Sequence, residues 1–199
     1  MTVRIVVTGP ECTGKTTLAA ALADSIGAKW VPEAARLYAE RAARRGRTLS
    51  AGDVEPIARA QMRAEDAALR TGRGDSAMGY RGDGAGARAT TRPPARLVLD
   101  TDLVSTAVYA QHYYGLDVPW ISAAALERRG NLYVLAAPDI PWVADGIRDR
   151  PAAREAMFAQ FQRALQRIGA NVVEVRGLGD ARFQAAIKEV RSLLEGERK

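Results

Sequence analysis

The sequence has few of the residues from which disulfides, metal clusters and membrane spans are built. Its 199 residues include one cysteine, Cys12, and one histidine, His112. A single cysteine cannot form an internal disulfide, which is typical of a reducing compartment, and a single histidine provides no metal-ligand spacing. No apolar run approaches the roughly 18 residues of a transmembrane helix. The chain also opens on a strand-like run rather than a secretory leader. We therefore expect a cytoplasmic protein without a membrane span.

Aromatic residues are also scarce, at 6% of the chain, and their scarcity bears on the interpretation of the charge. The formal net charge is +6, which in some proteins indicates nucleic-acid binding. Here the excess arginine falls in two stretches, at 36–47 and 70–96, without a series of aromatic side chains on which bases could stack. We therefore expect no nucleic-acid partner.

The most strongly patterned stretch is Gly9-Pro10-Glu11-Cys12-Thr13-Gly14-Lys15-Thr16, followed by Thr17. It matches G-x-x-x-x-G-K-[ST], the phosphate-binding loop, and it lies between a β-branched run at 3–7 and a helical pattern at 18–26. In this motif the glycines let backbone N–H groups surround the phosphates, while the lysine reaches the β- and γ-phosphates. The sequence therefore predicts a site for ATP and Mg²⁺, in which Lys15 binds phosphate and the Thr16 hydroxyl binds the metal.

Five short apolar runs alternate with helical patterns along the chain. The expected strands are at 3–7, 29–31, 97–100, 132–136 and 171–175. Continuous apolar runs are typical of parallel strands that are covered on both faces. We expect one α/β domain over residues 1–199, a P-loop NTPase with a five-stranded parallel sheet and helices on both faces. The Gly/Arg-rich stretch at 71–96 cannot bury a core and is expected to be a flexible insertion.

Carboxylates follow two of the expected strands, at the sheet edge where such proteins bind ligands. Asp100 ends the third strand, where it would hold Mg²⁺. Glu33 follows the second strand, where it could orient an acceptor hydroxyl and accept its proton, with Arg36 beside it. A surface ion pair between Glu33 and Arg36 is the alternative. Asp102 opens a helix and is either an N-cap or a second candidate for the base.

An arginine-rich loop follows the fourth strand, over residues 145–154. We expect a mobile lid here, in which Arg148 stabilises the transferring phosphoryl group, although a solvated loop is the alternative. Trp142, Tyr113 and Tyr114 could form flat walls for a ring, but each alone is more often a packing residue.

Several motifs occur together in a characteristic order: 9–17, Val31-Pro32-Glu33-Ala34-Ala35-Arg36 with Tyr38, Gln61, Asp100-Thr101-Asp102 with Thr106, Tyr113-Tyr114-Gly115, and Pro138-Asp139-Ile140-Pro141-Trp142-Val143 with Asp145-Gly146 and Arg148. This series resembles the ribosylnicotinamide kinase domain of the bifunctional bacterial NAD-biosynthesis regulator and related AAA-type ATPase/kinase domains. The resemblance implies an NMP-kinase-like fold and transfer of the γ-phosphoryl group of Mg²⁺·ATP to the ribose 5′-hydroxyl of nicotinamide riboside.

The resemblance also implies roles for individual residues. The candidate catalytic residues are Lys15, Glu33, Asp102 and Arg148, and the candidate acceptor-binding residues are Arg36, Tyr113, Trp142 and Asp145. The sequence departs from the family at Ala35, where an aromatic residue is common. A kinase for another nucleoside, and an ATP- or GTP-binding regulatory module that acts through a protein partner, both remain open. The sequence also leaves open whether the chain forms a homo-oligomer.

Overall fold

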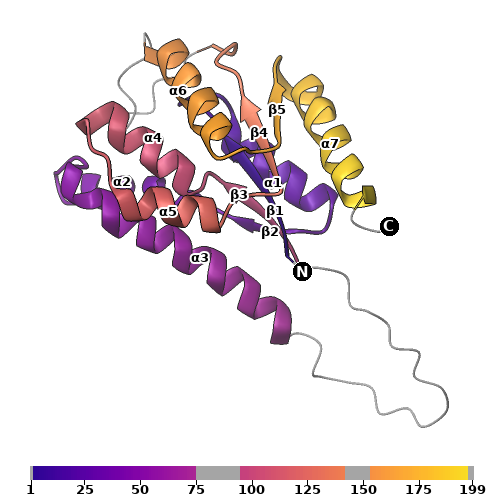
Figure 1. Ribbon diagram of the computed structural model, residues 1–199, viewed down its shortest axis with the longest axis horizontal. Coiled ribbons are helices and arrows are strands. Elements are labelled where there is room, and N and C mark those ends of the chain that lie inside the picture. The colour runs from indigo at the N-terminus through magenta and orange to yellow at the C-terminus, as the bar shows by residue number, and fades with distance from the viewer. Residues whose placement is uncertain (1, 75–94, 142–152, 197–199) are drawn as a thin grey trace.

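The computed structural model describes residues 2–74, 95–141 and 153–196, in which strands and helices alternate (Figure 1). In chain order the elements are β1 (Thr2–Thr8), α1 (Lys15–Ser25), β2 (Lys29–Val31), α2 (Ala34–Ala43), the 3-10 helix η1 (Ala51–Asp53), α3 (Val54–Gly74), β3 (Ala95–Asp100), α4 (Leu103–Tyr114), α5 (Pro119–Glu127), β4 (Leu132–Ala136), α6 (Arg154–Arg167), β5 (Val172–Val175) and α7 (Gly179–Gly196). The expected alternation of strands and helices is confirmed.

The five strands form one parallel sheet in the order β2-β3-β1-β4-β5. β1 lies between β3 and β4, so that Val7 is in register with Asp100 on one side and with Val134 on the other. The chain leaves β1 toward β2 and β3 on one side and later returns to β4 and β5 on the other. Such a change of direction opens a crevice at the carboxyl end of the central strand. The loop at 9–14 begins at this point.

Two hydrophobic cores cover the two faces of the sheet. Val3, Ile5 and Val7 point from β1 into a core formed with α1 and α7, and Val6 points into the opposite core with α3, α4, α5 and α6. Figure 1 places α1 and α7 on one side of the sheet and α3 to α5 on the other. All four of these side chains are fully buried, which explains why the strand is apolar at consecutive positions.

The structure corrects the ends of the insertion predicted at 71–96. α3 continues through Gly74, and β3 begins at Ala95 because Ala95 and Arg96 pair with Thr2 and Val3 of β1. Both ends of the stretch therefore belong to regular elements, and the remainder at 75–94 lies outside the described residues, as does most of the predicted lid. Within the described ranges, every helix is too short or too polar to cross a membrane.

Candidate functional site

The loop between β1 and α1 has the backbone geometry of an anion-binding site. Gly9, Cys12 and Gly14 have positive φ angles of 132°, 51° and 74°. α1 begins directly after Gly14, and no side chain caps its first turn. The N–H groups of that turn point toward the loop, where the oxygens of an anion can accept hydrogen bonds from them.

Lys15 lies within this loop rather than in solvent. Its side chain is buried, and Nζ donates a hydrogen bond to the carbonyl oxygen of Pro10 at 2.6 Å. The hydroxyl of Thr13 donates to the same carbonyl oxygen at 2.9 Å. These bonds close the loop around a space in which a phosphate oxygen would compete with the carbonyl of Pro10 for the lysine ammonium.

Asp100 lies next to the loop at the end of β3, in register with Val7 of β1. Its side chain is buried, and Oδ1 has no hydrogen-bond partner among the described residues. A buried carboxylate oxygen without a donor is costly, and a bound cation would satisfy it. The Thr16 hydroxyl, in the first turn of α1, adds a second oxygen of the kind that Mg²⁺ prefers. Asp100 and Thr16 therefore fit the predicted metal site.

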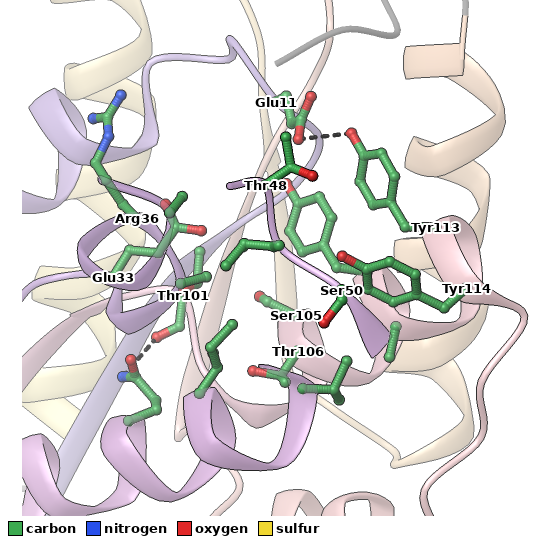
Figure 2. Close-up of a pocket in the computed structure, with 18 of the residues that line it drawn as sticks. Glu11, Glu33, Arg36, Thr48, Ser50, Thr101, Ser105, Thr106, Tyr113 and Tyr114 are labelled. Carbon is green, nitrogen blue, oxygen red and sulfur yellow. Dashed lines mark hydrogen bonds between the residues drawn. The ribbon is translucent and has the colours of Figure 1, made fainter. Parts of the chain in front are cut away.

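A cavity of about 410 Å³ adjoins the loop and is lined by residues of α2, α3 and α4. Of the residues predicted for the acceptor side, Glu33, Arg36, Tyr113 and Tyr114 line it, and Glu11 of the phosphate loop joins them. Figure 2 shows Glu11 and Tyr113 on one wall, with Glu33 and Arg36 across from them. The cavity therefore has carboxylates and aromatic rings next to a phosphate-binding loop.

Helix α4 forms the aromatic wall and also holds the loop. The Tyr113 hydroxyl donates to Oε1 of Glu11 at 2.9 Å, and the Tyr109 hydroxyl donates to the carbonyl oxygen of Gly9 at 3.2 Å. The rings of Tyr109 and Tyr113 stack, with centroids 6.3 Å apart and an interplanar angle of 19°. The hydroxyls of Thr8 and Ser105 hydrogen-bond at 2.8 Å. Tyr109 is a site residue that sequence reasoning missed.

Asp102 acts as the N-cap of α4, one of the two interpretations that its position allowed. Its carboxylate accepts hydrogen bonds from the N–H groups of Val104 and Ser105 and from the Tyr133 hydroxyl, at 3.0, 3.2 and 2.8 Å. Burial raises the pKa of Asp102 to about 6, against the lowering effect of these hydrogen bonds. Of the two candidate bases, only Glu33 is among the described residues that line the cavity.

Comparison with known proteins identifies the family. The sequence model of a family described as an AAA domain matches residues 4–182. The chain belongs to this AAA domain family. The match begins within β1, covers the phosphate loop and the other four strands, and ends in the first turn of α7.

Two related proteins carry the same name. The trifunctional NAD biosynthesis/regulator protein NadR of Escherichia coli (strain K12) is 30% identical over 105 residues, which are 50% of this chain and 25% of that protein. NadR of Salmonella typhimurium is 29% identical over 99 residues, 48% of this chain and 24% of that protein. The matched segments therefore span about a quarter of the length of these relatives. The resemblance that the motifs indicated is confirmed.

Solved structures show the same fold. A crystal structure of NadR protein in complex with NR has a TM-score of 0.74 at 24% identity and covers 98% of this chain and 52% of that one. Deoxyadenosine kinase from M. mycoides with bound dATP has a TM-score of 0.50 at 10% identity and covers 95% and 99%. The AAA domain is therefore an α/β P-loop NTPase with a kinase-like fold.

In this AAA domain, Arg182 is a second residue that sequence reasoning missed. It is buried in the first turns of α7 and donates to the carbonyl oxygens of Thr13, Ala137 and Gly177, and it pairs with Asp139. The sequence feature that could have identified Arg182 is its position four residues before Ala186, on the apolar face of a helix. A charged side chain on such a face needs polar partners. Arg182 therefore ties the phosphate loop to the loops that follow β4 and β5.

Arg154 is the part of the predicted arginine-rich lid that the structure describes. It begins α6, where its guanidinium donates to the carbonyl oxygens of Ile140 and Cys12 at 2.9 and 3.4 Å. An arginine of this stretch therefore reaches the phosphate loop. Trp142, Asp145 and Arg148 lie outside the described residues.

Proposed function

We propose that this AAA domain is a Mg²⁺·ATP-dependent kinase that transfers the γ-phosphoryl group of ATP to the ribose 5′-hydroxyl of nicotinamide riboside. The observation that carries the proposal is the position of the cavity, which is lined by carboxylates and stacked tyrosines and shares Glu11 with the phosphate loop. The likeness to NadR structures bound to NR, and to NAD and AMP-PNP, supports the choice of ligands.

On the nucleotide side, the loop amides and Lys15 would bind the phosphates of ATP, and Arg154 adds a fixed positive charge near Cys12. Asp100 and Thr16 would hold Mg²⁺, which when bound neutralises charge on the phosphates. Phosphoryl transfer needs positioning and charge stabilisation more than covalent chemistry from the protein. We propose that Arg148 adds a further charge from the lid.

On the acceptor side, the cavity suits a cationic ring. Nicotinamide riboside carries a pyridinium, which is attracted by the faces of aromatic rings and by carboxylates. Tyr109 and Tyr113 provide the rings, and Glu11 and Glu33 provide the carboxylates. Glu33 would orient the 5′-hydroxyl and accept its proton. We propose that Arg36, Trp142 and Asp145 complete the acceptor site.

A kinase for another nucleoside is the second candidate, and the far side of the cavity favours it. The hydroxyl side chains of Thr48, Ser50 and Thr106 line the cavity and could hydrogen-bond a polar base. Ala35 also lines it with only a methyl group, which leaves space for a ring of different size. The choice of acceptor therefore has to be measured.

The test is the release of ADP by the purified protein with Mg²⁺·ATP, in the presence and absence of nicotinamide riboside. We expect release that depends on the riboside, with the mononucleotide detected by mass spectrometry. Lys15→Ala is expected to lower this activity by about 100-fold, because it removes the ammonium that contacts the transferring group. Lys188→Ala, at an exposed lysine of α7, is the matched control and should keep full activity.

Three outcomes would decide against parts of this proposal. A fully active Lys15→Ala protein would overturn the mechanism. ADP release that responds to adenosine, uridine or another nucleoside but not to nicotinamide riboside would show that the responding nucleoside is the acceptor. ADP release that no small molecule stimulates, together with nucleotide-dependent binding of a protein, would favour a regulatory module.

A further inference from the structure

Gln61 is buried on α3 and hydrogen-bonds two other segments of the site. Its Oε1 accepts from the N–H of Ala34 at 3.2 Å, and its Nε2 donates to the carbonyl oxygen of Thr101 at 3.3 Å and to Oε1 of Glu65 at 3.4 Å. The orientation of the amide is fixed, because the N–H of Ala34 can only donate and the carbonyl of Thr101 can only accept. One side chain therefore joins the start of α2, the end of β3 and α3.

The bond to Ala34 replaces a cap that α2 otherwise lacks. Glu33 occupies the N-cap position, but its side chain makes no capping hydrogen bond. The N–H of Ala34 is one of the first-turn donors that a helix leaves unpaired, and Ala34 is buried. Gln61 satisfies this donor from a neighbouring helix, and Glu33 lines the cavity without capping α2.

The bond to Thr101 holds a strained turn. Thr101 has a φ angle of 69°, a left-handed conformation that is rare for a β-branched residue and persists only where its surroundings fix it. Its N–H donates to the carbonyl oxygen of Val7 at 2.9 Å, and its carbonyl oxygen accepts from Gln61. The turn lies between the metal candidate Asp100 and the N-cap Asp102, so Gln61 fixes the backbone on which Asp100 sits.

We propose that Gln61 is a positioning residue that sets the separation between the acceptor carboxylate of Glu33 and the metal carboxylate of Asp100. This inference rests on the proposed kinase function. Both carboxylates belong to segments that the amide of Gln61 holds directly. The pairing of β2 with β3 ends at Val31 and Leu99, so Gln61 joins the two segments beyond the last pair of the sheet. Loss of the amide would leave Glu33 and the turn at Thr101 without this link beyond the end of the β2–β3 pairing.

The kinetic test replaces Gln61 with methionine, which keeps the length of the side chain but cannot form the three hydrogen bonds. We expect kcat/KM for the nucleoside acceptor to fall by about 10-fold or more, because small errors in the placement of reacting groups are costly. The KM for ATP is expected to change less than the KM for the acceptor, because Tyr109 and Arg182 hold the phosphate loop. Gln184→Met, at an exposed glutamine of α7, is the matched control.

A second measurement does not depend on any activity. Amide hydrogen exchange of the ligand-free protein is expected to be faster at Ala34 and around Thr101 in Gln61→Met than in the wild type, and unchanged in Gln184→Met. Should Gln61→Met fail to fold, Gln61→Asn, whose amide is one methylene shorter, serves for both measurements.

The two measurements separate the possible failures. Without acceptor-dependent turnover in the wild type, the kinase proposal fails, while faster exchange at Ala34 and Thr101 would still assign the positioning role to Gln61. Two results would overturn the role of Gln61. One is unchanged amide exchange at both Ala34 and Thr101, and the other is a folded variant in which the KM values for ATP and for the acceptor rise equally.

Discussion

At the scale of single residues, Gly9 is a point where the phosphate loop passes close to the backbone of β4. A Cβ atom added there would lie 2.6 Å from the carbonyl oxygen of Ala136, and the φ angle of 132° is one that other residues rarely adopt. The obstacle is backbone, so the loop itself would have to shift. Only glycine fits this position without strain.

Gly9→Ala is therefore expected to lose ATP binding and to lower the free energy of unfolding by about 1–3 kcal/mol. Differential scanning fluorimetry with and without Mg²⁺·ATP measures both effects, the first as a lost thermal shift. Gly27→Ala is the matched control, since Gly27 also has a positive φ of 60° but a Cβ there would meet no atom within 4 Å. Equal thermal shifts with ATP in the wild type and Gly9→Ala would contradict this prediction.

The residues that sequence reasoning found and those it missed differ in how far their partners lie along the chain. The phosphate loop is a local motif that can be identified from the spacing of its residues. Glu33 and Asp100 were predicted from their positions at the ends of two expected strands. Tyr109 bonds a residue 100 positions away, and Arg182 bonds one 169 positions away. Contacts of this kind depend on the packing of whole elements, which no local pattern of residues contains.

At the scale of elements, the start of α3 shows how charge can fix a helix end. Asp53 completes a capping box with Ser50, and its carboxylate also accepts two hydrogen bonds from Arg47 at 2.9 Å. The hydrogen bonds from the guanidinium of Arg47 lower the pKa of Asp53 to about 2, with help from Ser50 and against the opposing effect of burial. Arg47 and Ser50 both line the cavity, so this cap also shapes its far side.

Asp53→Asn is expected to lower the melting temperature by a few degrees at pH 7. Because the pKa of Asp53 is lower in the folded than in the unfolded protein, its contribution is complete above pH 4 and is lost as the pH falls toward 2. The gap in melting temperature between wild type and variant should therefore be constant from pH 7 to pH 4 and narrow below pH 4. A gap that is the same at pH 3 and pH 7 would contradict the prediction.

The predicted boundaries of the elements were less accurate than their order. Hydrophobic runs identified all five strands. The central strands β1, β3 and β4 are largely buried, while the edge strands β2 and β5 are apolar but partly exposed. The Gly/Arg-rich composition after residue 70 favoured an early end for α3, but the helix continues to Gly74, and β3 begins at Ala95 rather than residue 97. Edges of helices and strands depend on hydrogen bonds to neighbouring elements, here those of β3 to β1.

At the scale of the whole molecule, the two hydrophobic cores lie on opposite faces of the sheet. Arg182 joins three loops at the edge of the sheet where the strands end. It connects α7 to the phosphate loop through Thr13, to the end of β4 through Ala137 and Asp139, and to the β5–α7 loop through Gly177. Burial lowers the pKa of the Arg182 guanidinium, and the carboxylate of Asp139 opposes this effect. A charge is kept at this depth because several acceptors surround it.

Arg182→Met keeps much of the side-chain volume but leaves three carbonyl oxygens and one carboxylate without their donor. We expect it to lower the free energy of unfolding, measured by urea denaturation, by about 1–3 kcal/mol, because buried carbonyl oxygens lose their donor. We also expect ATP affinity to fall by about 10-fold in calorimetry at a temperature where the variant is folded, because Thr13 then loses a hydrogen bond that holds the phosphate loop. Arg191→Met, at an exposed arginine of the same helix, is the matched control for both quantities. A variant that loses stability but binds ATP as the wild type does would show that Arg182 stabilises the fold without holding the phosphate loop, which would then be held by α4 and by Arg154.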